Sequence, residues 1–375
     1  MNARSNGIVP APIAELPWKL MLLLFCLAGF GAVVLYSAAG GSLLPWAAPH
    51  LLRFTVALGL AIGISRFSPD FWKKMTFPIY GAVLAMLILV ELLGQIGGGS
   101  QRWLNLGVIT LQPSELMKPT IVLTVALFFD RLPASKLHTF DAIWPPLVLM
   151  GFPSALVLLQ PDLGTTITIV AGGVVVAFMA GLPMRLFVGA GAALAVLAPL
   201  AFFFGLQPYQ QRRVTTFMDP SADPLGAGYH VNQSAIAIGS GGLWGKGFLD
   251  GTQSHLNYLP EGHTDFVFAT MAEEWGLVGG IAILIGFALL FSWGFRVALR
   301  SNTRYGKLVA AGLTTTIFFY VSINLMMVMG LAPVVGIPLP FLSHGGSSML
   351  TIMICIGLIM SIDRKPGRRG GAFSS

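Results

Sequence analysis

Residues 258–269 read Tyr-Leu-Pro-Glu-Gly-His-Thr-Asp-Phe-Val-Phe-Ala and join the longest polar segment of the chain to a long apolar run. The proline and the glycine in this stretch break regular structure, and Thr264 is a residue type that caps helices. Asp265 is therefore predicted to lie in the first turn of the following helix, at the positive end of the helix dipole. A carboxylate at this boundary between polar and apolar sequence is the first candidate for a functional residue.

The apolar run after Asp265 is one of many. Of the 375 residues, 55% are hydrophobic and only 10% are charged, and the mean hydropathy is +0.78. Because soluble domains carry roughly 25% charged residues, this composition predicts an all-α integral membrane protein, organised as a single polytopic domain over 1–375. Apolar runs of bilayer-spanning length, about 20 residues each, occur at 18–38, 50–67, 75–95, 113–131, 142–160, 163–181, 184–206, 266–295, 306–331 and 347–362.

Lys and Arg are divided unequally between the two sides of such a ten-helix bundle. With the N-terminus inside, 16 of the 22 Lys and Arg residues fall on the inner side, which the positive-inside rule places in the cytoplasm. We therefore expect both termini in the cytoplasm, with a lead-in over 1–17, a tail over 363–375 and one large extracytoplasmic loop over 207–264. The net charge of +7 is then a signal of topology and does not indicate nucleic-acid binding. Cys26 and Cys355 lie inside apolar runs, so no disulfide framework is expected.

Polar groups are also predicted at the outer ends of earlier spans. Glu115 and Lys118 are three residues apart at the start of a helix, so they can form an ion pair. That pair either only tolerates the membrane or forms the polar wall of a cavity. The turn between 142–160 and 163–181 contains Asp162, which can cap the next helix or, alternatively, bind substrate or metal. This pair of spans could also form a re-entrant hairpin.

Glu273 and Glu274 follow Asp265 by eight and nine residues, about 12–14 Å deeper along a continuous helix. Paired acids at that depth need a proton or a partner, for which Lys118 and backbone donors are the candidates. From the residues alone, two function classes stay open. Asp265 as a general base at the outer rim suits an enzyme with a substrate that is part lipid and part phosphate or sugar. A proton path through Asp265, Glu273 and Glu274 suits a carrier or flippase.

The outer loop over 207–264 keeps apolar residues at intervals, and we expect it to be ordered and packed over the mouth of the bundle. Its histidines lack zinc-ligand spacing and have no Cys partner, so no metal site is predicted. Gly245-Lys246-Gly247 resembles a fragment of a phosphate loop, but the strand–loop–helix context of such a loop is missing. The outer-side cations that could hold a phosphate are Arg102, Lys118, Arg212, Arg213 and Lys246.

Several short sequence motifs occur at intervals along the chain. They are Gln101-Arg102-Trp103, Gln112-Pro113-Ser114-Glu115 with Lys118, Gln160-Pro161-Asp162-Leu163-Gly164, Asp223-Pro224-Leu225-Gly226, Gln233-Ser234, Gly239-Ser240-Gly241-Gly242, and Leu259-Pro260-Glu261 with His263-Thr264-Asp265-Phe266. Together these resemble the SEDS family of bacterial cell-wall proteins (shape, elongation, division and sporulation). Gly251-Thr252-Gln253 and the segment 335–340 resemble the RodA branch rather than the FtsW branch. Two positions depart from the family pattern: His344 stands where Tyr is frequent, and Gly262 where a larger residue is common.

The resemblance implies a peptidoglycan glycosyltransferase of the bacterial plasma (inner) membrane. Such an enzyme polymerises lipid II, an undecaprenyl-diphosphate-linked disaccharide pentapeptide, into glycan strands on the extracytoplasmic face during cell elongation and shape maintenance. Asp265 matches the essential Asp of the family and would act as the general base. The implied partners are a class B penicillin-binding protein and the elongation machinery. No cofactor is certain, although a divalent cation such as Mg²⁺ could assist. The alternatives are a lipid II flippase and a septal, FtsW-like polymerase.

Beside the catalytic Asp265, the resemblance and the outer-side placement together predict a set of substrate-binding residues, with no metal ligand among them. The set comprises Arg102, Glu115, Lys118, Asp162, Arg212, Arg213, Lys246, Glu261, His263, Thr264 and Ser343.

Overall fold

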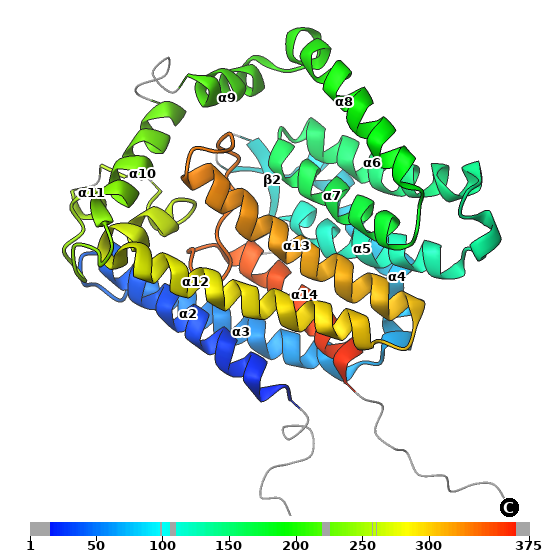
Figure 1. Ribbon diagram of the computed structural model, residues 1–375, viewed down its shortest axis with the longest axis horizontal. Helices are drawn as coiled ribbons and strands as arrows, with labels where there is room; N and C mark the ends of the chain where they lie inside the picture. Colours follow the sequence, from blue (N-terminus) through cyan, green and yellow to red (C-terminus); the bar gives the residue numbers. More distant parts are fainter. Residues whose placement is uncertain are drawn as a thin grey trace, which may run out of the picture.

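The computed structural model describes residues 16–97, 100–105, 110–219, 226–256, 258–259 and 261–364, and its elements carry the labels of Figure 1. Most of the predicted cytoplasmic lead-in, most of the predicted tail and the Asp223-Pro224-Leu225 part of one motif lie outside the described residues.

Each of the ten predicted spans corresponds to one helix. These helices are α2 (Trp18–Ala38), α3 (Ala47–Arg66), α4 (Pro69–Leu93), α5 (Pro113–Arg131), α6 (Trp144–Leu159), α7 (Leu163–Met179), α8 (Met184–Phe204), α12 (Val267–Arg300), α13 (Arg304–Val328) and α14 (Gly346–Asp363). Within the described residues, eight helices are long and apolar enough to cross a membrane. Of the other two, α7 is shorter, and α5 carries four charged side chains. The all-α integral membrane class is confirmed, and the number of crossings stays a prediction.

A small antiparallel sheet between α4 and α5 was not predicted. Strand β1 (Gln95–Gly97) pairs with β2 (Ser100–Asn105), which pairs with β3 (Thr110–Leu111). Its local signal is the run of three glycines at 97–99 followed by the alternating Arg-Trp-Leu-Asn. The sheet matters for function because β2 presents Arg102 to the outer end of the bundle.

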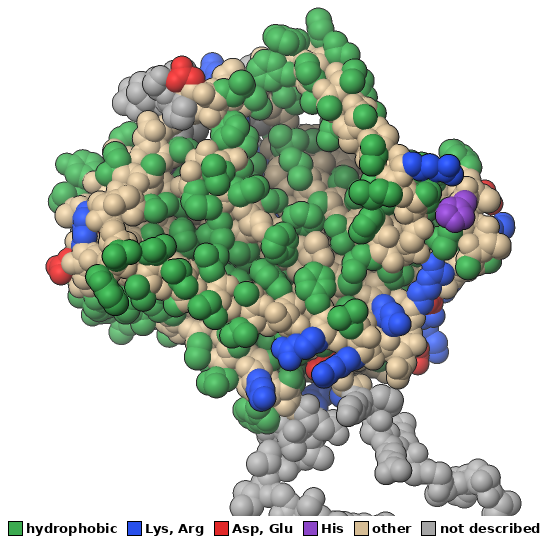
Figure 2. Space-filling view, in the orientation of Figure 1, with side chains coloured by type: hydrophobic (Ala, Val, Ile, Leu, Met, Phe, Trp, Pro, Cys, Tyr) green, Lys and Arg blue, Asp and Glu red, His purple; other side chains and the backbone are tan. Residues whose placement is uncertain are grey.

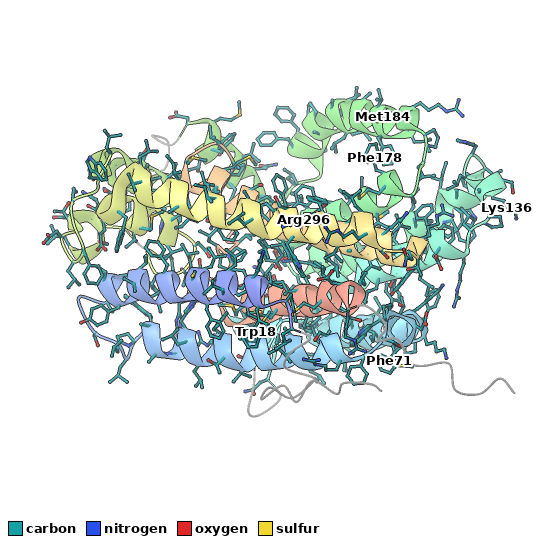
Figure 3. The ribbon with its side chains drawn as sticks, turned by 60° about the horizontal axis from the view of Figure 1, so that its bottom comes forward. Trp18, Phe71, Lys136, Phe178, Met184 and Arg296 are labelled. Atoms are coloured by element: carbon teal, nitrogen blue, oxygen red, sulfur yellow. The ribbon has the colours of Figure 1, made fainter. Side chains whose placement is uncertain are left out.

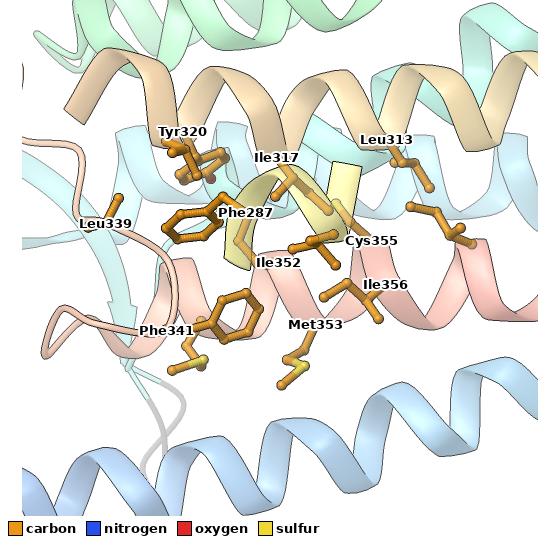
Figure 4. Close-up of a cluster of buried hydrophobic side chains, with 14 of the residues drawn as sticks. Phe287, Leu313, Ile317, Tyr320, Leu339, Phe341, Ile352, Met353, Cys355 and Ile356 are labelled. Carbon is orange, nitrogen blue, oxygen red and sulfur yellow. The ribbon is translucent and has the colours of Figure 1, made fainter. Parts of the chain in front are cut away.

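The core of the bundle is built around α13 and α14. Figure 4 shows side chains of α12, α13 and α14 interlocking with Leu339 and Phe341 of the α13–α14 loop, and all of those that it labels are buried. The last outer loop is thus anchored in the core at two points. Cys26 and Cys355 are both free thiols, as the sequence predicts.

The described part of the large outer loop is mostly helical. It forms α9 (Pro208–Met218), α10 (Ala227–Gly241) and α11 (Thr252–His255). Helix α10 packs against α12, and the Ser234 hydroxyl donates to the Val328 carbonyl at the end of α13, at 2.7 Å. Two further turns of 3₁₀ helix, Ala134–Lys136 and Phe140–Ala142, connect α5 to α6.

Helix α12 is broken at Gly276, which has φ of 60° and ψ of −159°. A broken helix leaves backbone groups without partners, and here the glycine-rich segment 242–247 pairs with them. The hydrogen bonds are Leu277 N to Gly242 O (3.0 Å), Val278 N to Leu243 O (3.2 Å), Lys246 N to Glu273 O (2.9 Å) and Gly247 N to Glu274 O (3.1 Å). The helix was predicted to be continuous, but it consists of two helical segments separated at Gly276. Segment 242–247 of the outer loop is hydrogen-bonded to both of them.

Replacing Gly276 by Ala should destabilise the protein by about 1–3 kcal/mol or more, because its φ disfavours a side chain. The added Cβ would also lie 2.4 Å from the Gly245 nitrogen. Gly280→Ala is the matched control in the same helix, since its Cβ would meet nothing closer than 3.7 Å. Melting curves in detergent should show a lower midpoint for Gly276→Ala alone. Equal midpoints for the two variants would contradict the assigned break.

Helix α8 stands apart from the other helices. Figure 3 shows it beyond α7, with Met184 at one end and Phe178 facing it. The Phe178 and Phe187 rings meet at 5.3 Å between centroids, whereas residues 188–200 are all exposed.

Basic side chains gather at one end of the bundle. Figure 2 shows Lys and Arg concentrated toward the lower right, where α12 ends and α13 begins, while hydrophobic side chains cover the middle of that face. This is the end that the sequence analysis places in the cytoplasm.

Candidate active site

A cavity of about 510 Å³ opens at the opposite end of the bundle. The start of α5, the start of α7, strand β2, the turn at 261–265, the α13–α14 loop and the start of α14 all contribute to it. Its lining residues are Arg102, Trp103, Gln112, Glu115, Asp162, Thr165, Glu261, Thr264, Asp265, Val335, Gly336, Ile337, Pro338, Gly345, Gly346, Ser347 and Ser348.

Asp265 lies just before α12 and not in its first turn. The helix begins at Val267, with Phe266 as the N-cap residue and no side-chain cap. The predicted cap, Thr264, instead donates its hydroxyl to the Glu261 carboxylate at 2.5 Å. These two corrections share a cause, because residues 261–266 form a turn and the helix begins only at Val267. Asp265 is therefore free of any capping role for α12.

The backbone of this turn is held by donors from other elements. Four successive carbonyl oxygens each accept a hydrogen bond: Gly262 from Thr270 Oγ1 (3.0 Å), His263 from His344 N (2.9 Å), Thr264 from Ser343 Oγ (2.5 Å) and Asp265 from Asn324 Nδ2 (2.8 Å). Asn324 also donates to the Ile337 carbonyl at 2.7 Å, which ties the turn to the α13–α14 loop. A backbone fixed in this way holds the Asp265 side chain in place before substrate binds.

The Asp265 carboxylate is half-buried and faces the cavity. No hydrogen bond to it is found among the residues that the structure describes. Gly336 approaches it closely, since a Cβ there would lie 3.4 Å from Oδ2. Burial, and secondly the negative charge of Glu261, raise the pKa of Asp265 to about 6. A carboxylate with a pKa near the working pH suits a general base.

Among the described residues, Arg102 is the one Lys or Arg that lines the cavity. Its Nε donates to the Gln160 carbonyl at 2.9 Å and its Nη2 to the Pro161 carbonyl at 2.5 Å. Nη1 lies 3.7 Å from Asp162 Oδ2. The guanidinium is thus oriented by the α6–α7 turn at the cavity wall.

Asp162 acts as the N-cap of α7. Its Oδ1 accepts from Thr165 N and its Oδ2 from Thr165 Oγ1, both at 3.0 Å, and Gln112 Nε2 donates to Oδ2 at 3.2 Å. The capping interpretation is confirmed, and both carboxylate oxygens are engaged.

The predicted pair of Glu115 and Lys118 is confirmed and has a third member. Lys118 Nζ donates to Glu115 Oε1 at 2.6 Å and to the Tyr320 hydroxyl at 2.7 Å, and that hydroxyl donates to Glu115 Oε2. All three side chains are buried. Glu115 lines the cavity, whereas Lys118 lies behind it and is absent from the lining.

Three other predicted cations are not brought to this cavity. Lys246 bonds to Glu273 Oε1 and to Thr252 Oγ1, both at 2.7 Å. Arg213 lines a separate small cavity beside the end of α13, and Arg212 lies on α9 and is exposed. Their contact with substrate stays a prediction.

Of the two candidate partners for Glu273, backbone donors are confirmed and Lys118 is wrong. Glu273 bonds to Lys246 and also accepts hydrogen bonds from the backbone N–H groups of Thr252 (2.9 Å) and Gln253 (2.9 Å) at the start of α11, while Glu274 accepts from the Ser37 hydroxyl at 2.5 Å. Lys118 is occupied elsewhere, and the partners of Glu273 belong to the outer loop. Glu273 therefore fastens that loop to α12.

A cluster that sequence reasoning missed lies at the rim of the cavity. The ring of His344 bridges the Trp46 carbonyl, 3.2 Å from Nδ1, and Arg53 Nη1, 2.8 Å from Nε2. A carbonyl can only accept and a guanidinium can only donate, so His344 is neutral with its proton on Nδ1. This agrees with its lowered pKa, which burial and then Arg53 cause. The sequence contained one indication of this cluster, namely Arg53, a cation near the outer start of α3.

The remaining predicted residues surround the same turn. His263 stacks on the Trp46 ring at 4.1 Å between centroids, and Ser343 is buried with its hydroxyl bonded to backbone. No group of three or more His, Cys, Asp or Glu side chains suited to a metal ion is present in the described part of the chain.

Comparison with known proteins places this arrangement in a family. The family of cell cycle proteins that comprises FtsW, RodA and SpoVE matches residues 18–367. The peptidoglycan glycosyltransferase MrdB of Escherichia coli K12 is 42% identical, with 92% of each chain covered. The probable peptidoglycan glycosyltransferase FtsW of Nitrosomonas europaea is 35% identical, with 93% of each chain covered.

Solved structures of similar chains indicate the same family. A chain from a peptidoglycan synthase complex that coordinates polymerisation and crosslinking matches with a TM-score of 0.79 and 34% identity, over 92% of this chain and 97% of that one. The rod-shape-determining protein RodA of Thermus thermophilus matches with a TM-score of 0.68 and 30% identity, over 92% and 96%. The chain described here therefore belongs to the FtsW/RodA/SpoVE family, the SEDS family that its sequence motifs resemble.

Proposed function

We propose that this chain is a peptidoglycan glycosyltransferase of the RodA type, which polymerises lipid II during cell elongation with Asp265 as its general base. The observation that carries the proposal is the position of the Asp265 carboxylate, which faces a cavity of about 510 Å³. The turn that carries Asp265 is held by hydrogen bonds to four of its backbone carbonyl oxygens. The higher identity to MrdB than to FtsW supports elongation rather than septation.

The chemistry suits these groups. The 4-hydroxyl of the incoming N-acetylglucosamine must lose a proton as it attacks the anomeric carbon of the other sugar, and Asp265 accepts that proton. The bond to the lipid diphosphate breaks in the same step, and its developing negative charge needs a cation. Arg102, which lines the cavity, would supply that cation. A divalent cation, if bound, would share in neutralising the diphosphate.

The flippase alternative loses support. It requires Glu273 and Glu274 to form a proton path in the membrane, but the contacts described above hold Glu273 against Lys246 and the start of α11. A carboxylate engaged by several donors is a poor relay, because each proton transfer would break that network. We therefore retain the polymerase as the single proposal.

The partner and the location follow the same reasoning. We propose a class B penicillin-binding protein as the partner, since the complex represented among the structural relatives joins polymerisation to crosslinking. The chain would lie in the bacterial inner membrane, and the concentration of Lys and Arg at one end of the bundle supports an extracytoplasmic cavity at the other end.

The direct test is incubation of the purified chain with lipid II in detergent, followed by gel separation of the products. We expect a ladder of glycan strands. Detergent micelles have no sidedness, so flipping cannot produce that result. Absence of strands from folded protein, both alone and with its crosslinking partner, would refute the proposal.

The pH profile of polymerisation offers a second test. Asp265 must be ionised to accept a proton, and its pKa is raised to about 6, so kcat/KM should fall tenfold per pH unit well below pH 6. Glu261→Gln removes a negative charge that raises this pKa, so the acidic limb should shift to lower pH in that variant. Rates measured between pH 4.5 and 8 would show both effects. If the acidic limb of the pH profile lies at the same pH in Glu261→Gln as in the wild type, the coupling between Glu261 and Asp265 is contradicted.

A further inference from the structure

A cavity that the proposed reaction does not use lies at the other end of the bundle. Its volume is about 450 Å³, and its walls come from the α3–α4 loop, the start of α4, the end of α12, the α12–α13 loop and the end of α14. Lys and Arg gather at this end (Figure 2), which the sequence analysis places in the cytoplasm. The volume falls within the roughly 300–1,000 Å³ of sites that hold small organic molecules.

Four charged side chains line this cavity, and their formal charges cancel. They are the acids Asp70 and Asp363 and the cations Arg300 and Arg364. No salt bridge joins either acid to either cation in the part of the chain that the structure describes. Arg364 donates through Nη1 to the Arg66 carbonyl at 2.9 Å, which leaves its other N–H groups available. The cavity thus offers cations and anions that do not neutralise one another by direct contact.

The position of Asp363 is unfavourable for the helix that carries it. Asp363 is the last residue of α14, where the negative end of the helix dipole disfavours a carboxylate. Its side chain is exposed and has no hydrogen bond or ion pair among the described residues. The fold therefore gains nothing from this charge, although it fixes the wall around it: the Ser361 hydroxyl donates to the Phe67 carbonyl at 2.7 Å.

Aromatic side chains mark the level of the lipid headgroups beside the cavity. The rings of Phe67, Phe71 and Trp72 contact one another at 4.7–5.8 Å between centroids, and lining residues 68–70 lie between them in sequence. Trp is enriched at membrane–water interfaces. Phe67 is 48% exposed, and Leu299, next to Arg300 on the opposite wall, is 80% exposed. A polar cavity flanked by apolar surface suits a molecule with a charged head and apolar chains.

We infer that this cavity binds the headgroup of a phospholipid of the cytoplasmic leaflet that carries both a phosphodiester and a primary ammonium group, namely phosphatidylethanolamine. Pockets between spans on this side of a membrane bind lipid headgroups. The phosphodiester accepts hydrogen bonds from Arg300 and Arg364, and the ammonium group donates to Asp70 and Asp363. An anionic headgroup would leave both acids without a cation, whereas this headgroup has no net charge, like the cavity. The inference goes beyond polymerisation and does not depend on it.

The test measures lipid binding to the full purified chain by native mass spectrometry. Phosphatidylethanolamine, phosphatidylcholine and phosphatidylglycerol with identical acyl chains are titrated separately. We expect the first to bind about tenfold more tightly than the other two, because choline has no N–H to donate and glycerol carries no positive charge. Arg300→Gln should weaken binding of all three lipids, since all contain the phosphate. Asp363→Asn should weaken phosphatidylethanolamine about tenfold and leave phosphatidylglycerol unchanged or bound more tightly.

Lys307→Gln is the matched control, because Lys307 is an exposed cation at the same end that does not line the cavity. It should change none of the three affinities. Melting curves in lipid-free detergent should coincide for all variants, so that a loss of lipid binding is not a loss of folding. Added phosphatidylethanolamine should then raise the melting midpoint of the wild type more than that of Asp363→Asn.

Several results would overturn the assignment. They are equal affinities for the three lipids in the wild type, a preference for phosphatidylglycerol, and an unchanged pattern in either Arg300→Gln or Asp363→Asn. Equally tight binding of soluble glycerophosphoethanolamine would also overturn it, because the site would then be one for a soluble phosphate ester. None of these measurements uses turnover, so they are independent of whether the chain polymerises lipid II.

Discussion

Asp265→Asn should lower the rate of lipid II polymerisation by about 10²–10⁴-fold, the usual contribution of a general base. The substitution keeps the size of the side chain and removes its charge and basicity. Asp265→Glu should also fail largely, because a carboxylate displaced by about an ångström loses its alignment with the attacking hydroxyl. Polymerisation per folded molecule, measured with lipid II in detergent, gives both values.

The stability of Asp265→Asn separates catalysis from folding. Because burial and Glu261 raise the pKa of Asp265 to about 6, the folded protein binds a proton at this site more tightly than the unfolded chain does. The folded state is therefore favoured by protonation below about pH 6, and above it the ionised carboxylate is a net cost. Asn removes that cost, so the melting temperature at pH 7.5 should be unchanged or higher. Normal specific activity, or activity lost in proportion to folded protein, would end the general-base assignment.

Sequence patterns predicted the features that depend on near neighbours in the chain. The ten apolar runs correspond to ten helices, the i,i+3 spacing of Glu115 and Lys118 produced their ion pair, and Asp162 caps α7. Each of these follows from a window of a few residues or from one span. Asp265 was chosen as the candidate acid from its place at the end of a polar segment, and its role as general base stays a prediction.

Long-range contacts were beyond that reasoning. Tyr320 joins Lys118 across 202 residues, and no local pattern distinguishes it from other tyrosines in a span. Backbone donors to Glu273 were foreseen, but its cation Lys246 was not, because the break at Gly276 and the fold of 242–254 over it decide which cation arrives. The same holds for the cavities, whose walls come from elements far apart in sequence. Arg102 lines the cavity of about 510 Å³ only because it lies on β2, a strand that was not predicted.

The triad of Glu115, Lys118 and Tyr320 provides the prediction with the largest effect on stability. Lys118→Met should cost about 3–5 kcal/mol, the usual penalty for leaving a buried charge without its partner. Glu115 would then keep only the Tyr320 hydroxyl as a partner in a largely buried site. Tyr320→Phe is the matched control: it keeps the aromatic ring, 4.3 Å from Lys118 Nζ, and removes one hydroxyl, at about 1–2 kcal/mol.

Removing both charges distinguishes a structural pair from a substrate contact. In Glu115→Gln with Lys118→Met the site holds no unpaired charge, so the melting temperature should recover most of what Lys118→Met loses. We expect polymerisation per folded molecule to recover as well, because Lys118 lies behind the cavity wall and its ammonium donates to Glu115 and Tyr320. If the double variant melts normally yet stays as inactive as the worse single variant, a charge acts on substrate, and Glu115, which lines the cavity, is the one in position to do so. If it melts no better than the worse single variant, charge compensation is not what this triad provides.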